Sequence, residues 1–191
     1  MPLPEELMLT MNCTNIVKAI HYDGDNVSTE CIDSEGVGYL SYCLDNDISL
    51  MGFCRRAQML VVVSGATIIQ DIPTWFAQQG VDYNYEHRRE KGEGEIYRDY
   101  VPHSVTLPEG SKLSEFYNTT TLTNCPSWHH QTILGTEGTP LRVAATATVA
   151  GVEMVEGIER TDKTCALAVQ FHPEAAVVKH LGKAVNNDNA G

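Results

Sequence analysis

The chain has 191 residues, of which 42% are hydrophobic and 20% charged, so we expect one domain, residues 1–191, with a substantial core. Its formal net charge is −12, and its 13 basic residues are dispersed, which argues against nucleic-acid binding because phosphate contacts need clustered Lys and Arg. No apolar run is long enough to span a bilayer, and the acidic N-terminus does not resemble a secretory signal. We therefore expect a cytoplasmic protein with small-molecule or protein partners.

Six cysteines are spread along the chain: Cys13, Cys31, Cys43, Cys54, Cys125 and Cys165. They lack the Cys-x-x-Cys spacing of metal sites, and with a cytoplasmic location we interpret them as reduced thiols. The alternative, which the even count permits, is disulfides in a secreted protein. The sequence also has no glycine-rich phosphate loop. It therefore predicts no cofactor and no metal.

The first half of the chain predicts strands that alternate with helices. In chain order these are a strand at 7–10, a helix at 34–44, a strand ending at 52, a helix from 55 to about 64 and a strand at 67–72. A polar, glycine-punctuated segment at 78–100 follows, which is either a flap over the substrate or a solvated insertion.

The second half predicts short strands separated by Gly, Pro and Asp. They lie at 103–107, 120–123, 141–148, 152–158 and 165–171. Parallel strands with crossover helices, followed by more antiparallel strands, predict an α/β sandwich of three layers.

Cys54 lies where the strand ending at Gly52 meets the start of the next helix. This sharp strand-to-helix turn predicts a nucleophile elbow, with the thiol at a helix N-terminus where the helix dipole favours the thiolate. The alternative is a buried structural cysteine, because free Cys is among the most buried residue types.

A nucleophilic cysteine needs a base and a group that orients the base, and His172 and Glu174 fit these roles. On an extended stretch, side chains two residues apart point to the same side, so Glu174 can orient the imidazole of His172. Alone, His-Pro-Glu is a weak signal, and its pairing with Cys54 strengthens it.

Six stretches carry a family resemblance, in the order GFCRRAQ, SGATIIQDIP, HSVTLPEGSKL, TNCPSWHHQ, GVEMVEGIE and AVQFHPE. With them the chain resembles class I glutamine amidotransferases, and more closely the γ-glutamyl-γ-aminobutyrate hydrolase branch of the γ-glutamyl hydrolase peptidases. The resemblance implies a flavodoxin-like three-layer α/β fold with a mainly parallel central sheet. It also implies Cys54 as nucleophile, His172 as general base and acid, and Glu174 as the residue that orients it.

The chemistry implied is hydrolysis of a γ-glutamyl amide through a γ-glutamyl thioester. The oxyanion would be held by the backbone N–H of Arg55 and by one from the loop around Asn12. We expect His130 and Gln131 near the substrate, since neighbouring His129 would face the opposite side of a strand. Gln58 either contacts the substrate or packs beneath the elbow.

Three departures from the family pattern favour a second hypothesis, a catalytically impaired relative used for binding or assembly. Met11-Asn12-Cys13 replaces a run of glycines, Arg56 replaces a glycine, and strand-helix units are missing at the ends. Arg56 should strain the elbow, obstruct the site or pair with an acid. The missing units would expose a sheet edge, so we expect a homo-oligomer. A glutaminase subunit that supplies ammonia to a synthase is a third hypothesis.

Overall fold

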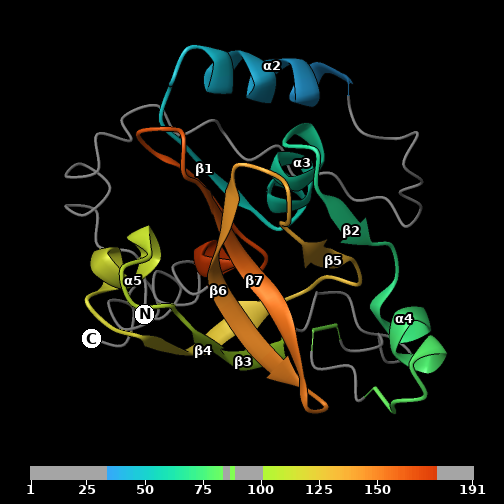
Figure 1. Ribbon diagram of the computed structural model, residues 1–191. Coiled ribbons are helices and arrows are strands. Elements are labelled where there is room, and N and C mark those ends of the chain that lie inside the picture. The colour runs from blue at the N-terminus through green and yellow to red at the C-terminus, as the bar shows by residue number, and fades with distance from the viewer. Residues whose placement is uncertain (1–33, 84–86, 89–100, 176–191) are drawn as a thin grey trace, which may run out of the picture.

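The computed structural model describes residues 34–83, 87–88 and 101–175 (Figure 1). The helices of this part of the chain are α2 (Ser34–Asp45), α3 (Arg55–Val63), α4 (Ile72–Gln78) and α5 (Lys112–Tyr117). The strands are β1 (Leu50–Phe53), β2 (Thr67–Ile69), β3 (Val101–Thr106), β4 (Thr121–Ser127), β5 (Thr132–Gly135), β6 (Leu141–Val149), β7 (Val152–Arg160) and β8 (Ala166–Val169).

All the described strands join in one sheet. Its order is β1-β8-β7-β6-β3-β4, with β5 also paired to β7 and β2 paired to β5. β1 and β8 run parallel, with Gly52 opposite Ala168 and Phe53 opposite Val169, and the other described pairs are antiparallel. The predicted α/β class is therefore confirmed. The sheet is mixed and not mainly parallel as expected, because β1 with β8 is the one parallel pair among the described strands.

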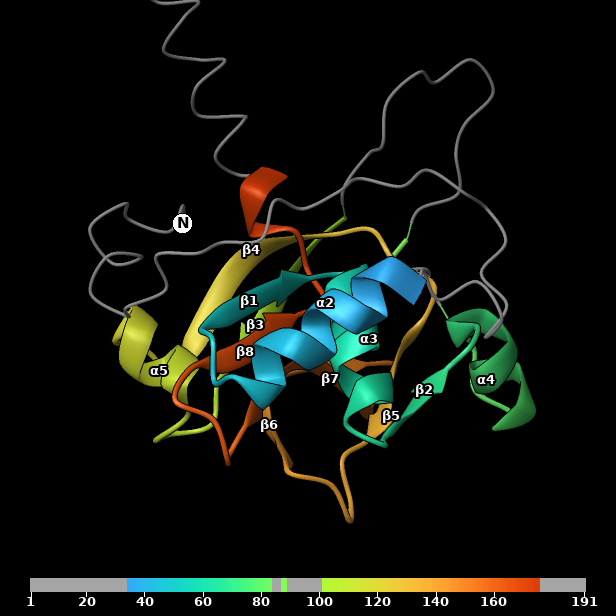
Figure 2. The same ribbon diagram turned by 90° about the horizontal axis from the view of Figure 1, so that it is seen from above.

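β8 separates two apolar clusters, because successive side chains of a strand point to opposite faces. Ala166 and Ala168 pack on the side of α3, in a cluster that also holds Leu60. Leu167 and Val169 pack in the cluster that also holds Leu113 of α5. Figures 1 and 2 show α2 lying over α3, with α4 and α5 at opposite ends of the molecule.

Helices α2 and α3 were predicted from the apolar pattern, whereas α4 and α5 were not. The strand predicted at 67–72 is wrong at its end, since Ile72 begins α4. The Asp71 side chain accepts a hydrogen bond from the backbone N–H of Thr74, and Ser111 does the same for Ser114 in α5. Both helices are short, so these N-caps were stronger signals than periodicity.

Strand β5 was also missed, because it is only four residues long. The expected strand at 7–10, most of the polar segment at 78–100 and Asn12 lie outside the described residues. Cys43, Cys54, Cys125 and Cys165 are free thiols.

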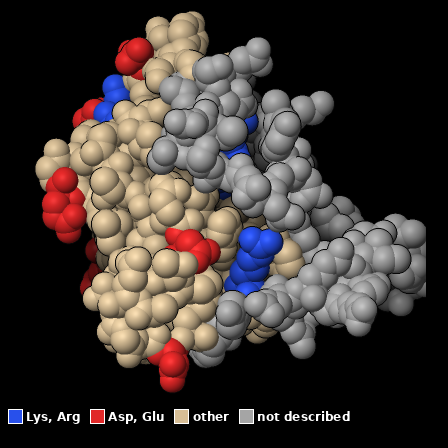
Figure 3. Space-filling model, turned by 90° about the vertical axis from the view of Figure 1, so that its right-hand side faces the viewer, with Lys and Arg blue, Asp and Glu red and all other residues tan. Residues whose placement is uncertain are grey.

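No helix in the described part of the chain is long and apolar enough to cross a membrane. On the face in Figure 3, the Lys and Arg side chains of the described residues do not join into a continuous basic patch.

Candidate active site

Cys54 stands between β1 and α3 in a backbone conformation that few side chains adopt. Its φ is 49° and its ψ is −106°, which costs on the order of 1 to 3 kcal/mol and must be imposed by the surroundings. The strand supplies part of that restraint, because the backbone N–H of Cys54 donates to Val169 O at 2.8 Å. The sharp turn predicted at Cys54 is therefore present in the structure.

Gly52 makes room for the large residue at position 56. A β-carbon on Gly52 would lie 2.9 Å from Arg56 Cβ, which is too close, and 3.1 Å from Ala168 Cβ, which is tight. The guanidinium of Arg56 turns along the helix and donates to Met59 Sδ at 3.3 Å. Arg56 is thus accommodated at the elbow through the missing side chain of Gly52, an outcome that the sequence did not suggest.

His172 follows β8, the parallel neighbour of the strand that leads into Cys54. Carboxyl ends of parallel strands meet at one edge of a sheet, so the two residues are brought together from 118 positions apart in the chain (172 − 54). The backbone N–H of His172 donates to Pro126 O at 2.7 Å, which fixes the segment after β8.

The His172 imidazole is buried and hydrogen-bonded to Glu174, with 2.6 Å between Nδ1 and Oε1. Burial alone would lower the pKa of His172, but hydrogen bonds with Cys54 and with Glu174 outweigh burial and raise the pKa to about 9. Residues 173–175 begin a helical turn, so the two side chains meet across that turn and not along the extended stretch that was expected.

The segment Trp128–Gln131 borders the nucleophile, since Cys54 Sγ lies 3.9 Å from Trp128 O in a weak hydrogen bond. Gln58 is buried beneath the elbow and its Nε2 donates to Gln131 O at 3.2 Å. The Gln131 side chain donates to Gln70 Oε1 at 2.9 Å. Gln58 and Gln131 therefore hold this segment in place.

His130 and His129 point in different directions. His130 Nδ1 lies 3.2 Å from Asp71 Oδ1 at the start of α4, and 36% of the His130 side chain is exposed. His129 is buried and faces the interior. Arg55 is the first residue of α3, where backbone N–H groups have no acceptor within the helix. The role of Asn12 as second oxyanion donor remains a prediction.

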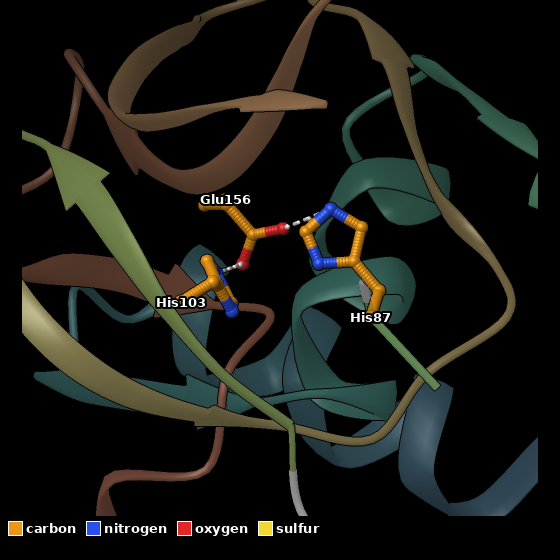
Figure 4. Close-up of side chains that lie close together, drawn as sticks. All are labelled: His87, His103 and Glu156. Atoms are coloured by element: carbon orange, nitrogen blue, oxygen red, sulfur yellow. Dashed lines mark ion pairs between the residues drawn. The ribbon is translucent and has the colours of Figure 1, made fainter. Parts of the chain in front are cut away.

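Behind this segment lies a buried polar cluster that the sequence did not predict as a site. Glu156 of β7 is fully buried between His87 and His103, as Figure 4 shows. The imidazole of His129 also lies beside the Glu156 carboxylate, with 3.5 Å between Nε2 and Oε1. Burial lowers the pKa of His87 to about 3. Burial would raise the pKa of Glu156, but the imidazoles of His87 and His129 outweigh burial and hold it well below its usual range.

One sequence signal could have revealed this cluster. Met154, Glu156 and Ile158 alternate along a predicted strand, and all three are buried. A carboxylate at an inward position of an alternating strand requires buried partners.

A family model described as Peptidase C26 matches residues 30–174, which cover the elbow, the cluster and His172 with Glu174. The chain belongs to the Peptidase C26 family. This agrees with the class I glutamine amidotransferase-like resemblance carried by the sequence motifs.

Two relatives and one solved structure illustrate the family. The chain is 26% identical over 175 residues to RP404 of Rickettsia prowazekii, provisionally assigned as glutamine amidotransferase-like, covering 78% of this chain and 61% of the relative. It is 31% identical over 134 residues to Rv2859c of Mycobacterium tuberculosis, a provisional glutamine amidotransferase, covering 70% of this chain and 38% of the relative. The chain thus spans less than two thirds of either.

The crystal structure of a glutamine amidotransferase from Thermotoga maritima superimposes with a TM-score of 0.52 at 15% identity. The match covers 90% of this chain and 63% of that one, and it supports the fold.

Replacing Gly52 by Ala tests the packing at the elbow. We expect Gly52→Ala to lower the free energy of unfolding by about 1 to 3 kcal/mol, because the new methyl group meets Arg56 Cβ and Ala168 Cβ. In a double-mutant cycle measured by denaturant unfolding, Arg56→Gly should recover part of that loss. Gly38→Ala in α2, where nothing lies within 4 Å, is the control and should be neutral or stabilising. Equal effects of Gly52→Ala and Gly38→Ala would contradict this packing.

Removing either partner of His172 should lower its pKa from about 9 towards 6.5, as measured by NMR of labelled imidazoles in Glu174→Gln and Cys54→Ser. The raised pKa means that the protonated form is stabilised by folding. Its contribution is therefore complete below about pH 6.5 and is lost as the pH rises through about 9.

Wild-type protein should accordingly exceed Glu174→Gln in stability by about 1 kcal/mol near pH 6, and the difference should vanish at high pH. Glu153→Gln, at an exposed position on β7, is the matched control and should leave the pKa of His172 unchanged. A His172 pKa that is the same in all three variants would show that neither partner sets it.

Proposed function

We propose that this protein hydrolyses γ-glutamyl amides through a Cys54–His172–Glu174 triad. The observation that carries the proposal is the pairing of His172 with two partners at once. Glu174 Oε1 lies 2.6 Å from His172 Nδ1, and Cys54 hydrogen-bonds the same imidazole. A nucleophile, a base and an orienting carboxylate are the three parts that acyl transfer by a thiol requires.

The reaction begins with the Cys54 thiolate beside a protonated His172. The thiolate attacks the γ-carbonyl carbon, a C–S bond forms, and the carbonyl oxygen becomes an oxyanion near the backbone N–H of Arg55. When the C–N bond breaks, His172 gives its proton to the departing amine. The γ-glutamyl group is then a thioester on Cys54.

Acylation changes the environment of His172. It removes the Cys54 thiolate, one of the two partners that raise the pKa of His172, while Glu174 stays in place. His172 can then accept a proton from water, which attacks the thioester. Breaking the C–S bond releases glutamate and restores the thiolate beside a protonated imidazole.

Membership of the family supports γ-glutamyl amides as the substrate class, and the amine attached to the γ-glutamyl group is a further proposal. We infer a γ-glutamyl-γ-aminobutyrate-like substrate from the stretches that resemble that branch, with Gln58, His130 and Gln131 proposed as substrate contacts. Self-association of the chain, expected from its sequence, is likewise a proposal.

Covalent labelling tests the triad directly. An electrophilic glutamine analogue should add one equivalent of mass to Cys54, found by peptide mass spectrometry, and Cys54→Ser should abolish the addition. His172→Gln should slow labelling by a factor of about 10² or more, because the base is lost. Cys165→Ala, which removes a buried thiol directly before β8, is the control and should label like wild type.

Turnover of γ-glutamyl-γ-aminobutyrate, a γ-glutamyl anilide and glutamine then separates the functions. Preference for the first two supports the hydrolase, and preference for glutamine would indicate a glutaminase instead. A folded protein that neither labels nor turns over any of them would refute the catalytic proposal in favour of a binding or assembly role.

A further inference from the structure

We propose that His87, His103, His129 and Glu156 form a closed site for one Zn²⁺ ion, which holds the segment beside the nucleophile in place. The proposal is independent of the catalytic one, since none of these side chains belongs to the triad. The four come from four parts of the chain: the short stretch 87–88, β3, the connection after β4, and β7.

The spacing of the donor atoms suits a metal ion. Glu156 Oε1 lies 3.6 Å from His87 Nε2 and 3.5 Å from His129 Nε2, and Oε2 lies 3.4 Å from His103 Nε2. Ligands about 2.0 to 2.1 Å from a tetrahedral zinc are separated by about 3.3 to 3.4 Å. One donor atom from each of His87, His103 and Glu156 lies within 4.8 Å of the others, and the fourth donor that we propose, His129 Nε2, lies 3.5 Å from Oε1.

The same distances are long for hydrogen bonds, which prefer about 2.7 to 3.2 Å. Both ring nitrogens of His87 and His103, Nε2 of His129 and both carboxylate oxygens of Glu156 are buried without a hydrogen-bond partner in the described part of the chain. Buried polar atoms are rarely left in this state, because each costs about 1 to 3 kcal/mol. Figure 4 shows the Glu156 carboxylate between the imidazole rings of His87 and His103.

The surroundings of His129 give further support for a metal ion. Its Nδ1 lies 2.9 Å from Gln131 O, which can only accept, so Nδ1 bears the proton. Nε2 is then the nitrogen that faces the site, and it lies 3.5 Å from a carboxylate oxygen of Glu156. A metal ion at this point would contact both atoms. A backbone carbonyl on the far nitrogen is also how metal-binding imidazoles are usually oriented.

Charge leads to the same conclusion. An ionised carboxylate in a fully buried site is costly unless a positive charge offsets it. Three imidazole nitrogens and one carboxylate oxygen are a donor set typical of zinc, whereas calcium and magnesium prefer all-oxygen sites. Four protein donors and complete burial of Glu156 leave no open position for water, as in structural zinc sites.

Such an ion would act on the catalytic segment through His129. The neighbouring residue, Trp128, contacts the Cys54 thiol, and Gln131 O accepts from both His129 Nδ1 and Gln58 Nε2. Pinning His129 therefore fixes the wall of the active site. It also ties residue 87 to the sheet, together with the bond from the His129 backbone N–H to His87 O.

The test uses the full chain carrying Cys54→Ser, so that the catalytic thiol cannot itself ligate zinc. After treatment with a chelator, Zn²⁺ should bind with one ion per chain by elemental analysis and should raise the melting temperature. Co²⁺ in its place should give the intense visible absorption of a tetrahedral site, without a thiolate-to-cobalt band.

Variants then assign the ligands. Glu156→Gln and His103→Gln should each weaken Zn²⁺ binding at least 100-fold, whereas His130→Ala, which alters the exposed neighbour of His129, should leave it unchanged. If the ligand variants do not fold, the cobalt spectrum and the zinc-dependent melting of the Cys54→Ser chain still decide the question.

A folded Cys54→Ser chain that binds no stoichiometric Zn²⁺, or a cobalt spectrum without tetrahedral bands, would overturn the proposal. So would unchanged zinc affinity in folded His103→Gln or Glu156→Gln. Each of these results would leave the cluster as a buried polar network of histidines around the Glu156 carboxylate, without a metal ion.

Discussion

The parallel pairing of β1 with β8 is the constraint on which the site depends. Both strands end at the same edge of the sheet. Cys54 directly follows β1, and His172 lies three residues after β8. The bond from the Cys54 backbone to Val169 O closes this arrangement. It holds the nucleophile in a conformation that the isolated chain would avoid, so the fold supplies the energy stored at the elbow.

The space at that elbow is limited, and two positions share it. In the family pattern a glycine two residues after the nucleophile lets strand and helix approach. Here that position is Arg56, and the missing side chain is at Gly52 across the contact. The same close approach is obtained by removing a β-carbon from the strand. Arg56 at the elbow is therefore not by itself an argument against activity.

The buried carboxylate of Glu156 sets a second requirement. A charge in the interior must be offset, and the histidines around it belong to segments that also form the wall beside Cys54. The electrostatics of this cluster and the geometry of the active site are therefore linked through the connection between β4 and β5. Trp128 and His129 are adjacent in that connection. The backbone carbonyl of Trp128 contacts Cys54, and the imidazole of His129 lies beside Glu156.

By itself the sequence determined the α/β class, α2 and α3, the turn at Cys54 and the pairing of His172 with Glu174, because these depend on local periodicity and on short motifs. It missed α4 and α5, whose caps outweigh their weak periodicity, and it left the role of Gln58 open. Only the tertiary structure decided how Arg56 fits and which histidines surround Glu156. Those outcomes depend on contacts between residues far apart in the chain, which no local pattern encodes.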